Sequence, residues 1–157
     1  MFKNRHVKNI LSAVAVAVFG FVLLGLTFLF DFLFQSLLDR VVRFFTPDDF
    51  NMTWYWFPPA KHAMFMVIIG LISWPIFRSK LGSLYKAIYM TVPLAVVFAT
   101  IGILLYHWPV LPYLVGGLFA IGVLFYLYRT KQPWLYLYTV ILVALSLMIF
   151  TLLGGEI

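Results

Sequence analysis

Residues 87–128 read AIYMTVPLAVVFATIGILLYHWPVLPYLVGGLFAIGVLFYLY and contain no Asp, Glu, Lys or Arg. As one helix this run would measure about 63 Å, whereas the hydrocarbon core of a bilayer is about 30 Å thick. The chain must therefore turn back within it. Two prolines and interfacial residue types place the turn at residues 107–112. We predict a tight hairpin of two spans, at about 87–107 and 111–128, with a re-entrant loop as the alternative.

The composition of the whole chain also indicates a membrane protein. Of its 157 residues, 64% are hydrophobic and only 10% are charged, whereas an average soluble domain is about 25% charged. A water-soluble fold of this size could not bury so much apolar surface, so lipid must be the solvent for most of it. The chain has no cysteine, which excludes disulfides, thiolate nucleophiles and thiolate metal sites. The net charge of +6 comes from short clusters between apolar runs, so we expect no nucleic-acid partner.

Three further apolar runs lead to a predicted all-α integral membrane protein with five transmembrane helices in one domain, residues 1–157. The first run, about 10–34, follows a basic start and is too long for a cleaved signal peptide. The second, about 60–77, begins after two prolines, and the fifth, about 134–154, follows a polar connection. Polar residues recur at near-helical spacing after the first run. We therefore expect an interfacial amphipathic helix in an outer loop of about 35–59, with its continuity with the first span left open.

The positions of the basic residues predict the orientation of the chain. Cytoplasmic loops carry an excess of Lys and Arg, and in this arrangement eight of them share the side of the N-terminus while three lie on the other side. We therefore expect the N-terminus in the cytoplasm and the C-terminus outside, in the cytoplasmic membrane of a bacterium. The eight are Lys3, Arg5, Lys8, Arg78, Lys80, Lys86, Arg129 and Lys131, and the three are Arg40, Arg43 and Lys61.

Small residues four positions apart mark three candidate packing faces. Helices in a bilayer associate through close contact of such residues, because lipid is as apolar as leucine and supplies no hydrophobic drive. Each pair could pack within the chain or against a partner, either a larger membrane protein or a second copy. The pairs are Ala13 and Ala17, Ala95 and Ala99, and Gly116 and Ala120.

Three titratable residues are predicted to lie near the outer boundary of the hydrocarbon: Asp31, His62 and His107. Ionisable groups at that depth are candidate functional residues. Together they could bind a divalent metal, ligate a haem or relay protons. Their spacing is not specific for any of these, and we favour the simpler interpretation that they are hydrated side chains at an interface. We expect no metal site and no cofactor.

Four aromatic rings precede the second span in the sequence Trp54-Tyr55-Trp56-Phe57-Pro58-Pro59. Aromatic residues are enriched at membrane interfaces, so anchoring alone explains them. The alternative is a lid over a pocket for an apolar ligand, in which Trp54 and Trp56 would contact that ligand. The chain contains no nucleophile paired with a base, no metalloprotease motif and no phosphate-binding loop, so we do not expect an enzyme.

One family resembles the chain over nearly its whole length. The chain resembles the small membrane subunit of tripartite tricarboxylate transporters in four features. They are Trp56-Phe57-Pro58-Pro59, the following apolar helix with Gly70 and Arg78, the tight hairpin, and the C-terminal Phe150-Thr151-Leu152-Leu153-Gly154-Gly155. That resemblance implies a subunit that assists a larger permease and has no substrate site of its own. The long loop before Trp56 departs from that family. A second, weaker resemblance is to the tryptophan-rich sensory proteins related to the translocator protein. It rests on the length, the five spans and the aromatic Pro-Pro loop.

Two functions follow as expectations from this pattern. The first is a small noncatalytic subunit that packs against and supports a larger membrane partner, plausibly a transporter, because the spans contain almost no polar chemistry. The second is a stand-alone membrane binder of an apolar ligand, such as a lipid or tetrapyrrole, beneath the outer aromatic loop.

Overall fold

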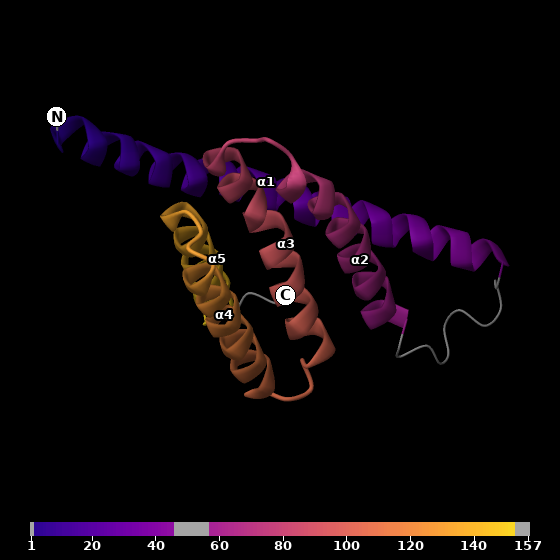
Figure 1. The fold of residues 1–157 in the computed structure, drawn as a ribbon. Coiled ribbons are helices and arrows are strands. Elements are labelled where there is room, and N and C mark those ends of the chain that lie inside the picture. Colours follow the sequence, from indigo (N-terminus) through magenta and orange to yellow (C-terminus); the bar gives the residue numbers. More distant parts are fainter. Residues whose placement is uncertain (1, 46–56, 153–157) are drawn as a thin grey trace.

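The computed structural model describes residues 2–45 and 57–152, which form five helices (Figure 1). Each helix is long and apolar enough to cross a membrane. The prediction of an all-helical membrane protein with five candidate spans is therefore confirmed. The helices are α1 (Phe2–Phe45), α2 (Phe57–Arg78), α3 (Ser83–Leu104), α4 (Leu111–Arg129) and α5 (Trp134–Leu152).

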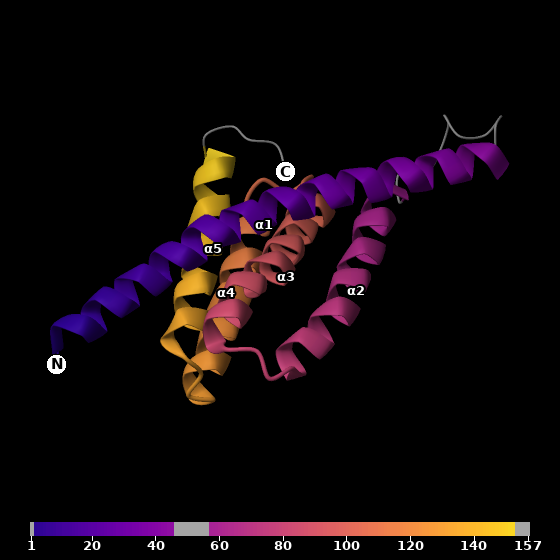
Figure 2. The ribbon, with the colours of Figure 1, turned by 90° about the horizontal axis from the view of Figure 1, so that it is seen from above.

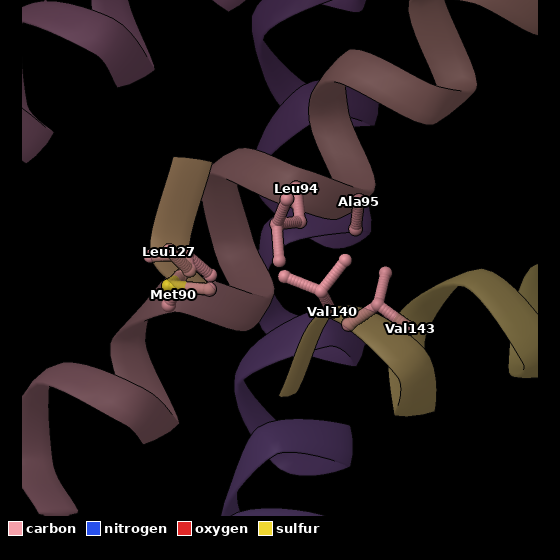
Figure 3. Close-up of a cluster of buried hydrophobic side chains, with 6 residues drawn as sticks. All are labelled: Met90, Leu94, Ala95, Leu127, Val140 and Val143. Carbon is pink, nitrogen blue, oxygen red and sulfur yellow. The ribbon is translucent and has the colours of Figure 1, made fainter. Parts of the chain in front are cut away.

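Helix α3 occupies the centre of the bundle and contacts all four other helices. Its residues supply most of the buried apolar core, and α5 packs along it (Figure 3). Leu94 and Ala95 of α3 meet Val140 and Val143 of α5, while Met90 lies beside Leu127 of α4. Because neighbours surround α3, all of its residues from 86 to 103 are buried or half-buried.

The predicted hairpin of the third and fourth spans corresponds to α3 and α4. These helices have 22 and 19 residues and are joined by a turn at residues 105–110. The Trp108 amide donates to the Leu105 carbonyl at 2.9 Å, and Pro112 follows in the first turn of α4. Proline is tolerated there because the first helical amides have no partner within the helix. Each arm is long enough to cross the bilayer, as the full hairpin requires.

The expected interfacial helix is not a separate element. Residues 32–45 continue α1 without interruption, so the helix is 44 residues long and part of the predicted loop 35–59 is helical. The physical reason lies in the sequence, since no proline or glycine occurs between Gly25 and Pro47 to end the helix. At 1.5 Å per residue α1 measures about 66 Å, roughly twice the hydrocarbon thickness. It crosses the other helices obliquely, and both of its ends extend past them (Figures 1 and 2).

Gly20 of α1 packs closely against the Thr91 side chain of α3. A Cβ atom added to Gly20 would lie 2.8 Å from Cγ2 of Thr91, which is closer than real Cβ contacts. Thr91 is 1% exposed, and its hydroxyl donates to the Ile88 carbonyl at 2.8 Å. Only glycine therefore fits at position 20 in this arrangement.

The connections divide between the two ends of the bundle. Figure 2 shows the α2–α3 and α4–α5 turns together at one end. The start of α2, the α3–α4 turn and the end of α5 lie at the other end, where the C-terminal half of α1 passes. This second end carries the polar residues described next.

Candidate functional site

A cavity of about 670 Å³ lies between α1, α2, α3 and α5. Its volume is within the range of small-molecule sites, which are about 300–1,000 Å³. Phe21, Phe28 and Phe150 on its rim are each 39–54% exposed, so the cavity is open at the side of the bundle. Three residues of its lining are polar: Asp31, His62 and Ser146. The others are apolar: Phe21, Leu24, Phe28, Ala99, Ile103, Leu147 and Phe150.

The structure brings Asp31 and His62 together at one wall of this cavity. Asp31 comes from α1 and His62 from the second turn of α2, and His62 Nδ1 lies 3.3 Å from Asp31 Oδ2. Gln35, one helical turn after Asp31, donates from Nε2 to Asp31 Oδ2 at 2.8 Å. The same Nε2 lies 3.0 Å from His62 Nε2. The three side chains therefore form one hydrogen-bonded cluster, here called the Asp31 cluster.

The geometry of the Asp31 cluster indicates its protonation state. The Gln35 amide has two N–H bonds, so it can donate to Asp31 Oδ2 and to His62 Nε2 together. With the Gln35 amide in this orientation, His62 Nε2 accepts and the ring proton is assigned to Nδ1, the nitrogen that faces Asp31. This network is consistent with a neutral imidazole beside an ionised carboxylate. The cluster as a whole then carries one negative charge.

The Asp31 carboxylate is not fully satisfied by the protein. Its Oδ1 atom is buried and has no hydrogen-bond partner within the described part of the chain. The side chain as a whole keeps 14% exposure. A buried carboxylate oxygen without a donor costs free energy, on the order of 1–3 kcal/mol or more. Such an atom indicates a position where a ligand can supply the missing donor.

An ion pair between α1 and α2, one helical turn after Gln35, fixes α2 against α1. Lys61 Nζ donates to Asp39 Oδ1 at 2.7 Å, and the Lys61 side chain is 8% exposed while that of Asp39 is 36% exposed. The Lys61 ammonium also lies 5.0 Å from the centre of the Phe57 ring. Phe34 of α1 and Phe65 of α2 pack with ring centres 5.7 Å apart. These contacts hold His62 at the cavity wall.

His107, the third predicted titratable residue, does not join the cluster. It is exposed in the α3–α4 turn, where the centre of its ring lies 3.7 Å from the centre of the Tyr106 ring. Across residues 2–45 and 57–152, no three His, Cys, Asp or Glu side chains come close enough to hold a metal ion. Trp54 and Trp56 lie outside the described residues.

The small residues divide by position. Ala95 and Ala99 are buried within the bundle, at 1% and 8% exposure, and Ala99 lines the cavity. Gly116 is also buried, and a Cβ atom there would contact the Phe98 ring at 3.6 Å. Ala13, Ala17 and Ala120 are half-buried. At least Ala95, Ala99 and Gly116 therefore serve packing within the chain.

Sequence reasoning did not identify Gln35, Asp39 and Lys61 as partners in this region. A signal was present, because Asp31, Gln35 and Asp39 follow at intervals of four and share one face of a helix. The adjacent pair Lys61-His62 offers a cation and an imidazole near the start of the following helix. The face becomes visible only when residues 31–39 belong to one continuous helix, and the sequence left the continuity of the first span with the following segment open.

A second cavity of about 550 Å³ lies between α3, α4 and α5 at the same end of the bundle. Its lining includes glycines and alanines together with the aromatic residues Tyr106, Trp108 and Tyr113. Its lining contains no charged residue. It offers a surface for apolar chains without the polar anchor of the first cavity.

Comparison of the chain with protein-family models, with curated proteins and with solved structures gives no match.

Proposed function

We propose that this protein is a membrane-embedded binder of an amphipathic ligand. The observation that carries the proposal is the cavity of about 670 Å³ with the Asp31 cluster on its wall. Ligand sites in proteins are mostly apolar, with a few polar groups that fix orientation. An ionisable residue inside a membrane domain is costly and is a functional candidate. The cavity combines both features and opens between helices, so a ligand can reach it from the lipid.

We also infer that the N-terminus is cytoplasmic, on the basis of the eight basic residues that share its side of the arrangement. The Asp31 cluster then lies toward the outer face of the membrane, where the polar part of an amphipathic molecule meets water. The apolar lining from Leu24 to Phe21 lies deeper. The polarity of the cavity therefore follows that of one leaflet of the bilayer.

The other expected function, a subunit that supports a larger membrane protein, has less support from the geometry. Its packing faces depended on six small residues, and Ala95, Ala99 and Gly116 are buried within the chain. The resemblance to the small subunit of tripartite tricarboxylate transporters implies no ligand site, whereas the described helices surround a cavity with a polar cluster on its wall. We therefore place ligand binding first.

Photolabelling in lipid nanodiscs tests ligand binding at the cavity. A long-chain alcohol that carries a diazirine on its tail is expected to label peptides containing Phe21–Phe28 and Phe150 several times more than other lipid-facing peptides. Ala99→Phe puts a ring into the cavity and is expected to reduce this labelling by about tenfold, because Ala99 lines the cavity at 8% exposure. Peptide mapping by mass spectrometry measures both effects.

Two further variants make this experiment decisive. Gly122→Phe adds the same ring where nothing lies within 4 Å of a new Cβ atom, so its labelling pattern is expected to match that of the original chain. Ile103→Trp narrows the cavity from α3 if Ala99→Phe does not fold. Even labelling over all exposed helices, unchanged by Ala99→Phe and by Ile103→Trp, would contradict the proposal.

A further inference from the structure

We infer that the ligand of this cavity is a long-chain cationic amphiphile, whose protonated amine pairs with the Asp31 carboxylate while its chain lies along α1. The inference rests on the proposed function, since it names the class of ligand for the same cavity. Three observations carry it: the charge of the site, the unpartnered oxygen and the direction of the apolar lining.

The charge of the site favours a cation. The titratable groups that face Asp31 are His62 on α2 and, next to it, Lys61. Lys61 is bound to Asp39 at 2.7 Å, so these two charges compensate each other. With Gln35 donating to Nε2, His62 is assigned as neutral. Among the described residues, the Asp31 carboxylate therefore has no cation beside it, and it lies on an apolar cavity, where the weaker dielectric screening strengthens its attraction for a cation.

The unpartnered oxygen favours a group with several donors. Asp31 Oδ2 faces both Gln35 and His62, whereas Oδ1 has no partner within the described residues. Rotation about the Cβ–Cγ bond of aspartate is soft, so a small turn of the carboxylate presents an oxygen to the cavity. An ammonium group has three N–H donors and no acceptor, which matches a carboxylate. An anionic head group would face repulsion from Asp31 and is excluded by the same argument.

The lining gives the direction of the chain. Asp31, Phe28, Leu24 and Phe21 follow one another along α1, and Asp31 and Phe21 are ten residues apart, a rise of about 15 Å. Leu147 and Phe150 of α5 line the opposite side of this path. An alkyl chain laid along it contacts aromatic and aliphatic side chains throughout, with its amine at Asp31. This is an arrangement that a single-chain amphiphile fits.

Competition against the photoreactive alcohol tests the head group. In nanodiscs of neutral phosphatidylcholine, dodecylamine, dodecanol and dodecanoate are compared as competitors, because they share one chain and differ in charge. Dodecylamine is expected to reduce cavity labelling at about tenfold lower concentration than dodecanol, and dodecanoate is expected to be the weakest. In Asp31→Asn, which keeps the size of the side chain and removes its charge, the amine is expected to lose this tenfold advantage.

The outcomes separate the two proposals. If dodecylamine and dodecanol compete equally with the original chain, the inference about the amine is overturned and ligand binding at the cavity stands. An advantage of the amine that survives in Asp31→Asn also overturns the inference, because the preference then comes from the membrane and not from the site. If the photoreactive alcohol does not label the cavity at all, the proposed function itself is contradicted. Should Asp31→Asn fail to fold, labelling of the other lipid-facing peptides of the original chain serves as the control: an advantage of the amine that is equally large there comes from the membrane and overturns the inference, whereas an advantage confined to the cavity peptides supports it.

Discussion

Asp39→Ala is expected to lower the free energy of unfolding by about 2 kcal/mol, because it leaves the Lys61 ammonium without its carboxylate. Removing one partner of a buried ion pair typically costs about 3–5 kcal/mol, and Asp39 is 36% exposed, which reduces the value here. Lys61 itself is 8% exposed and lies in the first turns of α2, where it has little access to water. Thermal or SDS-induced unfolding of the purified protein measures the loss.

The reason for the cost is the unpaired charge and not the loss of a contact. Replacing both partners by apolar residues of similar size, as in Asp39→Leu with Lys61→Met, is therefore expected to restore most of the stability. A double-mutant cycle gives the coupling between the two side chains. If the double variant loses as much free energy of unfolding as the two single variants together, the ion pair does not hold α2 against α1 and the explanation is wrong.

Gly20→Ala is expected to destabilise the packing of α1 on α3 by about 1–3 kcal/mol, the usual range for overpacking a close contact. The added Cβ atom would lie 2.8 Å from Thr91 Cγ2. Threonine is stiff about its first side-chain torsion, and the Thr91 hydroxyl is bound to the Ile88 carbonyl, so the methyl group has little freedom to move. The helices must therefore separate. The unfolding midpoint in detergent measures the effect.

A control and a rescue variant distinguish this clash from a general effect of alanine. Gly25→Ala lies on the same helix with nothing within 4 Å of the new Cβ atom, so it is expected to be neutral or slightly stabilising. Thr91→Ser removes the clashing methyl group and keeps the hydroxyl, so Gly20→Ala combined with Thr91→Ser is expected to regain most of the lost stability. Equal effects of Gly20→Ala and Gly25→Ala would show that the close approach at Gly20 is not required.

The sequence predicts the number of helices well because hydropathy and length alone decide it. A run without charges that is twice the bilayer thickness has to fold back, and the two prolines near His107 leave one place for the turn. The extent of α1 could not be predicted in the same way. Asp31 ends the apolar run but does not end the helix, because a charged residue is tolerated inside a helix and no proline or glycine follows until Pro47.

The candidate site was predicted in part. Asp31 and His62 were identified because ionisable residues near the hydrocarbon are unusual, whereas His107 met the same criterion and lies exposed in a turn. Sequence distance does not show which of the two histidines faces the aspartate. Pairs of small residues at a spacing of four do not indicate Gly20, because its partner is the methyl group of a threonine on another helix. The cavity depends on how α1 crosses the bundle, which the sequence does not specify.

Single-cysteine labelling tests the proposed membrane arrangement, which places the Asp31 cluster toward the outer face. The chain contains no cysteine, so each introduced thiol reports one position. With five crossings and a cytoplasmic N-terminus, a membrane-impermeant maleimide added to intact cells is expected to react with Trp108→Cys. It is expected to react with His6→Cys, Leu81→Cys and Gln132→Cys only after the membrane is permeabilised. Reaction of both Leu81→Cys and Trp108→Cys in intact cells would contradict the account, because α3 would then not cross the membrane between them.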